Sequence, residues 1–140
     1  MADYLAMART NYFRVTDEER YQELFKHLVV NGEIKDFTEE RDGVIYHGFG
    51  AYGSIDYQVD LENEESELDF DYFVKELQKI LPEDEAFVYQ ESGYEKLHYG
   101  DGCAIVVTSK DVREKCLSSW VENTMKELLG EDNKVTACSC

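Results

Sequence analysis

The sequence predicts an α+β domain with a largely antiparallel sheet and three helices packed on one face of it. Three segments have the apolar periodicity of amphipathic helices, and segments that alternate between apolar and polar residues separate them. Their order is β-α-β-β-β-α-β-β-β-α, which favours a sheet with its helices segregated to one face. A chain of 140 residues, 43% of them hydrophobic, supports one domain over residues 1–130 and a short mobile tail over residues 131–140.

The first strand is predicted at residues 11–15, after six residues that we expect to fray. Thr16 and Glu19 then form a capping-box pattern, which begins a helix. That helix is expected to end at Asn31-Gly32, because this pair readily adopts the left-handed backbone conformation. Its apolar face is formed by Tyr21, Leu24, Phe25, Leu28 and Val29.

The middle of the chain predicts three strands and a second helix. Residues 35–40 and 44–49 form a hairpin across Arg41-Asp42-Gly43, and residues 54–60 alternate as a third strand. The second helix covers residues 69–81 and is stopped by Pro82, the one proline of the chain. Its inward face is expected to contain Phe70, Phe73, Val74, Leu77, Ile80 and Leu81.

The last third of the chain predicts a three-stranded meander followed by a helix. The strands are expected at residues 86–91, 95–99 and 103–108, with turns at Ser92-Gly93 and at Gly100-Asp101-Gly102. Ser109 caps a third helix over residues 111–129, which Gly130 ends. Its buried face is expected to include Leu117, Trp120, Val121, Thr124 and Leu128.

Charge is the strongest global feature of the chain. It has 31 acidic and 14 basic residues, for a net charge of −17, and residues 60–99 hold 13 of the acids and only 3 of the bases. A field of this sign repels nucleic acids and anionic membranes and attracts basic protein surfaces. Solubility alone also explains such a charge, so a housekeeping domain stays an alternative.

Ten carboxylates are predicted to form a surface that binds a basic partner. Seven lie within residues 60–71, where Glu65 stands in place of the glycine that an EF-hand loop requires, so no calcium site is expected. If extended, that segment carries one charge per ~6 Å, sparser than the ~1.7 Å of duplex DNA, so mimicry of nucleic acid needs further acids. A solvated linker leading into a helix is the alternative. The predicted residues are Asp60, Glu62, Glu64, Glu65, Glu67, Asp69, Asp71, Glu83, Asp84 and Glu85.

Gly48, Gly50 and Gly53 have the G-x-G-x-x-G spacing of nucleotide-binding loops. A dinucleotide loop leads into a helix, whereas the residues that follow Gly53 alternate as a strand. The lysine, H-R-D and D-F-G motifs that accompany a kinase loop are missing. We therefore predict a glycine-rich hairpin turn or bulge. A small nucleotide-binding protein or enzyme, using this hairpin with His47 or His98, stays the alternative.

The cysteines and histidines predict no catalytic residue, no metal site and no cofactor. Cys103 with His98 lacks an orienting third group, and no pair has the spacing of zinc ligands. Cys103, Cys116 and the terminal Cys138-Ser139-Cys140 form no evident disulfide framework, so free thiols in a cytosolic chain are predicted. The N-terminus lacks the pattern of a secretory signal, and no apolar run has transmembrane length.

Two segments resemble a group of small acidic proteins from bacterial phages, plasmids and integrated elements. They are ARTNYFRVTDEERYQELF, with its A-R-x-N-Y-F-x-V opening, and ESGYEKLHYGDGCAIVVTS, with its G-x-E-K-L-x-Y pattern. The resemblance implies an accessory role in a mobile element, where inhibitors of host defence are often small, acidic and non-enzymatic. We therefore expect a cytoplasmic, non-enzymatic protein whose acidic face occupies a basic surface on a host nucleic-acid-handling or defence protein.

Overall fold

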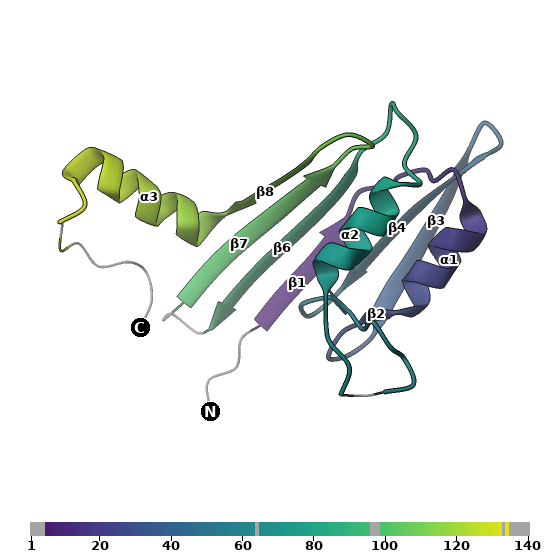
Figure 1. Ribbon diagram of the computed structural model, residues 1–140, viewed down its shortest axis with the longest axis horizontal. Helices are drawn as coiled ribbons and strands as arrows, with labels where there is room; N and C mark the ends of the chain where they lie inside the picture. Colours follow the sequence, from purple (N-terminus) through teal and green to yellow (C-terminus); the bar gives the residue numbers. More distant parts are fainter. Residues whose placement is uncertain (1–4, 64, 96–98, 133, 135–140) are drawn as a thin grey trace.

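The computed structural model describes residues 5–63, 65–95, 99–132 and 134, and shows a six-stranded antiparallel sheet with helices (Figure 1). The strand order is β3-β4-β1-β6-β7-β8, and β2 pairs with β5 in a separate two-stranded sheet. The fold class is confirmed as α+β with a mainly antiparallel sheet, although β2 adds one strand to the expected order. The elements are β1 Leu5–Thr10, α1 Glu18–Lys26, β2 Leu28–Val29, β3 Ile34–Arg41, β4 Val44–Ala51, β5 Asp56–Tyr57, α2 Phe70–Gln78, β6 Phe87–Glu95, β7 Tyr99–Val107, β8 Val112–Cys116 and α3 Leu117–Leu129.

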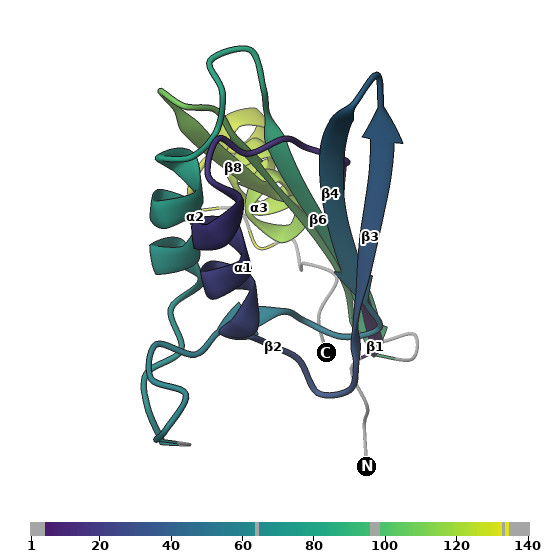
Figure 2. The ribbon, with the colours of Figure 1, turned by 90° about the vertical axis from the view of Figure 1, so that its right-hand side faces the viewer.

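Helices α1 and α2 lie side by side on one face of the six-stranded sheet (Figure 2). The core between them and the sheet is largely aromatic. The rings of Phe13 and Phe87 meet edge to face at 5.0 Å between centroids, and those of Phe49 and Phe73 at 6.2 Å. All four side chains are fully buried, so this cluster holds the helix layer on the sheet.

The ends of α1 differ from the prediction. Asp17, not Thr16, is the N-cap, and its carboxylate accepts a hydrogen bond from the backbone N of Arg20 at 3.0 Å. The backbone N of Thr16 donates instead to the carbonyl of Ile80 at 2.7 Å, which fixes Thr16 outside the helix. The helix also ends earlier than predicted, because residues 28–29 leave it to pair with β5.

The first strand and the final meander are shifted from their predicted positions. β1 occupies Leu5–Thr10, so the strand expected at residues 11–15 is wrong, and Phe13 makes only an isolated bridge to His47. The turns expected at residues 92–93 and 100–102 are wrong as well, because β6 and β7 pair straight through them. Antiparallel pairing satisfies the backbone groups of these small residues, which removes the need for a turn there.

Helix α3 does not pack on the face that carries α1 and α2, so the prediction of three helices on one face is wrong. Residues 112–116 form β8 at the edge of the sheet, and α3 follows without a connecting loop and projects beyond the sheet (Figure 1). No residue of α3 is buried, and Trp120 and Leu128 are 48% and 77% exposed. Within the described residues, β8 leads directly into α3, so no loop between them turns the helix back onto the core.

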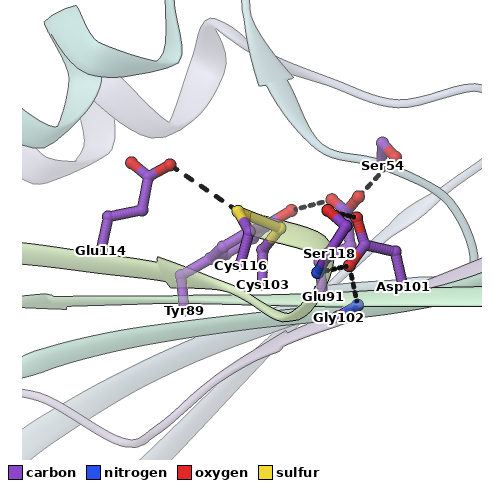
Figure 3. Close-up of a disulfide and its surroundings, with 9 residues drawn as sticks. All are labelled: Ser54, Tyr89, Glu91, Asp101, Gly102, Cys103, Glu114, Cys116 and Ser118. Atoms are coloured by element: carbon purple, nitrogen blue, oxygen red, sulfur yellow. Dashed lines mark hydrogen bonds between the residues drawn. A yellow bond between two sulfur atoms is a disulfide. The ribbon is translucent and has the colours of Figure 1, made fainter. Parts of the chain in front are cut away.

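Cys103 and Cys116 form a disulfide between β7 and β8, so the prediction of free thiols is wrong for this pair (Figure 3). They are directly opposed across the two strands, with 4.1 Å between their Cα atoms. Strand pairing thus brings together two cysteines that are 13 residues apart, which spacing alone did not indicate. The free-thiol argument for a cytosolic chain no longer applies. Cys138 and Cys140 lie outside the described residues, as does most of the predicted tail.

Replacing both cysteines of the disulfide, as Cys103→Ser with Cys116→Ser, is expected to lower the free energy of unfolding by about 2–3 kcal/mol. A disulfide that closes a loop of ~15 residues contributes about 3 kcal/mol by constraining the unfolded chain. Residual β7–β8 pairing in the unfolded variant would reduce this contribution. Urea unfolding followed by far-UV circular dichroism measures the change, with Cys138→Ser and Cys140→Ser together as the control. Alkylation of four thiols in the unreduced, unfolded protein would contradict the disulfide.

Candidate functional site

The carboxylates gather on the helix layer and its loops. Residues 16–33 and 54–86, which form α1, α2 and the segments around them, carry 17 acidic and 4 basic residues. Two basic residues are already paired within this layer, since Arg20 and Lys79 both bind Glu76. These hydrogen bonds, from Lys79 first and also from Arg20, lower the pKa of Glu76. Most of the net charge of the protein therefore lies on one side of the sheet.

The loop between β5 and α2 concentrates the acids of the predicted site. The backbone N of Val59 donates to the carbonyl of Glu67 at 3.1 Å, and Gln58 forms a bridge with Leu68. The loop therefore folds back on itself, and the expectation of an extended segment is wrong. Folding back brings its carboxylates closer together than the extended spacing implies. The exposed acids of this loop are Asp60, Glu62, Glu65 and Glu67, and Glu64 lies outside the described residues.

Two acids of the predicted site also have structural roles. Asp69 is the N-cap of α2, and its carboxylate accepts a hydrogen bond from the backbone N of Tyr72 at 3.1 Å. Asp60 accepts one from the backbone N of Glu62 at 3.0 Å, which shapes the loop. Asp71 lies exposed in the first turn of α2, where a negative charge favours the helix dipole. The acids most available to a partner are therefore Glu62, Glu65, Glu67 and Asp71.

The second group of predicted acids does not join the first. Residues 83–85 follow the other end of α2, about 14 Å away for a helix of this length (Figure 1). Arg14 binds Asp84 at 2.8 Å through Nη2 and Glu85 at 2.9 Å through Nε. Two of the three carboxylates are thus already paired, and they anchor the chain before α1 to the loop after α2.

Helix α1 supplies acids that the sequence reasoning did not include. Glu19 and Glu23 are exposed on α1, which is tied to α2 by the ion pair between Arg20 and Glu76 at 2.8 Å. Glu18 is also exposed, but its carboxylate binds His47. The amphipathic pattern of α1 indicated that these residues face solvent. Which other acids lie beside them depends on how the two helices pack.

The glycine motif does not form the predicted hairpin turn or bulge. Gly48 and Gly50 lie inside β4, which pairs with β3 on one side and with β1 on the other. A Cβ atom at Gly50 would lie 2.9 Å from the carbonyl oxygen of Ala8, so glycine allows the close approach of β1. Gly53, with φ of +149°, follows the strand. These glycines therefore do not form the strand-to-helix loop that holds a nucleotide phosphate.

His47, the histidine of the alternative enzyme hypothesis, is buried under the helix layer. Its Nε2 donates a hydrogen bond to Glu18 at 2.6 Å, and its ring packs against Tyr21 at 4.5 Å between centroids. Within the described ranges, its Nδ1 and the hydroxyl of Tyr21 have no hydrogen-bond partner. Burial raises the pKa of Tyr21. His98 lies outside the described residues. His47 therefore joins α1 to the sheet.

The chain matches no family model, no curated protein and no solved structure. Within the described parts of the chain, no three His, Cys, Asp or Glu side chains are grouped so that they could hold a metal ion. No helix in those parts has the length and apolar character needed to cross a membrane.

Proposed function

We propose that the protein is a non-enzymatic acidic binding protein of a phage or mobile element. Its acidic surface, made of the loop at residues 60–69 and the exposed faces of α1 and α2, occupies a basic nucleic-acid-binding surface on a host protein. The gathering of 17 acidic and 4 basic residues on this side of the sheet is the observation that supports it. The partner is a defence or DNA-processing protein, and the chain acts in the cytoplasm where such proteins work.

Inhibition by competition follows from this surface without any chemical step. The unpaired carboxylates attract a surface of clustered Lys and Arg, and they increase the rate of encounter at low salt. The folded loop sets several carboxylates close together, as phosphates are in a nucleic acid. Because the interaction is between exposed charges, added salt weakens it.

Displacement of a labelled oligonucleotide from purified basic nucleic-acid-binding proteins tests this function. The native protein is expected to displace it from one member of the panel. Its own dissociation constant for that member, measured without the oligonucleotide, is expected to rise at least about tenfold from 50 to 300 mM salt. The variant Glu62→Gln, Glu65→Gln, Glu67→Gln, Asp71→Asn is expected to need at least about tenfold more protein for the same displacement at low salt, since several charge contacts are removed together.

A matched control neutralises four acids outside the acidic surface, as Glu39→Gln, Glu40→Gln, Glu114→Gln, Glu131→Gln. It has the same net charge as the first variant but keeps the acidic surface. Displacement by the control is expected to stay within about threefold of the native protein. Equal losses in the two variants, or no displacement from any member of the panel, would show that the charge serves no specific partner.

A further inference from the structure

Helix α3 has an apolar face that the described chain covers only in part: Lys115 Nζ lies 5.6 Å from the centroid of the Trp120 ring, and much of the face stays exposed. Its apolar residues recur at i, i+3, i+4, i+8 and i+11, which places them along one stripe. Leu117, Trp120 and Leu128 on that stripe are 53%, 48% and 77% exposed. A helix of 13 residues is marginal in water by itself and gains most of its stability by packing an apolar face. The stripe therefore needs a surface to cover it.

The outer face of the sheet, opposite α1 and α2, offers such a surface. A groove of about 520 Å³ crosses β1, β6, β7 and β8, and Met7, Gly102, Ala104 and Leu117 supply its apolar lining. Met7 is 51% exposed there. Arg9 and Lys115 add two positive charges. Glu91 lines it too, but its carboxylate points to the opposite face, where it accepts hydrogen bonds from Ser54 and Tyr89 (Figure 3).

Helix α3 is held away from the groove of its own chain. The backbone N and Oγ of Ser118 both donate to the carboxylate of Asp101, at 3.0 and 2.9 Å, so β7 fixes the first turn of α3 (Figure 3). The disulfide fixes the residue just before the helix, because Cys116 is its N-cap. With no loop between β8 and α3, the helix cannot reverse direction to lie in the groove beside which it starts.

Charge favours a second copy of the chain as the occupant. Residues 112–129 carry three acidic and three basic residues, so two copies can meet there without the repulsion expected of a chain with net charge −17. Among the described residues, Arg9 and Lys115 have no ion pair, and neither has Glu127 of α3. Acidic residues of α3 from one copy thus complement the basic residues of the groove of the other.

We propose that the protein forms a symmetric dimer in which α3 of each copy lies in the outer sheet groove of the other. The contact is reciprocal, as a two-fold axis requires, and it covers both the exposed stripe and the groove. Leu117 belongs to both α3 and the groove lining, so the start of α3 borders the groove. A two-fold axis near Leu117 therefore generates both helix–groove contacts of the dimer. The proposal does not depend on the function of the acidic surface, which lies on the other face.

Sedimentation equilibrium of the full chain at about 10 μM tests the dimer, with twice the 16.3 kDa chain mass expected for the native protein. Leu128→Glu on α3 and Met7→Glu in the groove are each expected to weaken dimerisation at least about a hundredfold, since each places a charge in an apolar contact. Leu61→Glu, on the acidic loop, is the matched control and is expected to stay dimeric. Circular dichroism confirms that each variant is folded.

Mixing the two broken variants separates this arrangement from other dimers. A mixed dimer of the Leu128→Glu and Met7→Glu chains keeps one intact helix–groove contact, so it is expected to form at least about tenfold more tightly than either variant alone. If Met7→Glu stays dimeric while Leu128→Glu does not, the helices pack on each other and the proposal is wrong. A native protein that is monomeric at this concentration also contradicts the proposed dimer. The same holds if a monomer binds an oligonucleotide in its groove.

Discussion

The substitution Gly50→Ala is expected to lower the free energy of unfolding by about 3 kcal/mol, although it adds a single methyl group. The added Cβ would meet the carbonyl oxygen of Ala8 at 2.9 Å and the Cα atom of Arg9 at 3.6 Å. Both are backbone atoms of β1, so no side chain can rotate away, and the central strands β1 and β4 must separate. Overpacking that moves backbone typically costs about 1–3 kcal/mol, and this contact lies at the upper end.

Gly102→Ala is the matched control for this substitution. Gly102 also lies within a strand of the same sheet, but a Cβ there would meet only the carbonyl oxygen of Glu91 at 3.8 Å, an ordinary contact. The loss of chain entropy in the unfolded state then dominates, and Gly102→Ala is expected to change stability by less than about 1 kcal/mol, in the stabilising direction. Urea unfolding followed by far-UV circular dichroism measures both. Similar values for the two variants would contradict the close approach of β1 and β4.

Replacing Phe49 with alanine is expected to lower the free energy of unfolding by about 4 kcal/mol. Its ring is fully buried on the helix side of β4 and packs against Phe25, Phe73 and Phe87 at 5.7, 6.2 and 6.1 Å between centroids. Truncation removes contacts by which both α1 and α2 pack on the sheet. Phe→Ala substitutions in such cores cost about 3–5 kcal/mol, a large part of the stability of a domain.

Tyr52→Ala provides the control for the core substitution, because Tyr52 lies three residues along the chain and is 81% exposed. It is expected to change stability by less than about 0.5 kcal/mol. Backbone circular dichroism is the better probe for these measurements. The one tryptophan, Trp120, lies on α3 outside the core, and its fluorescence reports on that helix. A loss below about 1 kcal/mol for Phe49→Ala would mean that the aromatic cluster does not hold the two layers together.

The two proposed surfaces are compatible, because they use different sides of the molecule. The acidic surface lies on the helix layer, and the proposed dimer contact uses α3 and the outer face of the sheet (Figure 2). A dimer would present two acidic surfaces to a partner, and two linked contacts bind more tightly than one when the geometry allows both. The Leu128→Glu variant therefore also separates dimerisation from binding of the basic partner, since it keeps the acidic surface intact.

Features set by a few neighbouring residues could be predicted from the sequence. The β3–β4 hairpin turns at Asp42 and Gly43, whose φ values of 51° and 79° suit those residue types. Helix α2 begins after its cap at Asp69, and its inward side chains include Phe73, Val74 and Leu77 as expected. The acidic loop could be predicted as well, because a high density of acidic residues can be read from the sequence without the tertiary structure.

Features that depend on distant residues were decided only by the tertiary structure. The position of β1 between β4 and β6 determines that Gly50 allows close approach instead of forming a turn. The pairing of β7 with β8 brings Cys103 to Cys116. Arg14 forms ion pairs with Asp84 and Glu85, which lie some 70 residues further along the chain. Local propensity carries no information about such partners. The apolar stripe of α3 is the clearest case. Its periodicity predicted a helix with one apolar face. Because that helix starts at the edge of the sheet, the core of the same chain does not cover this face.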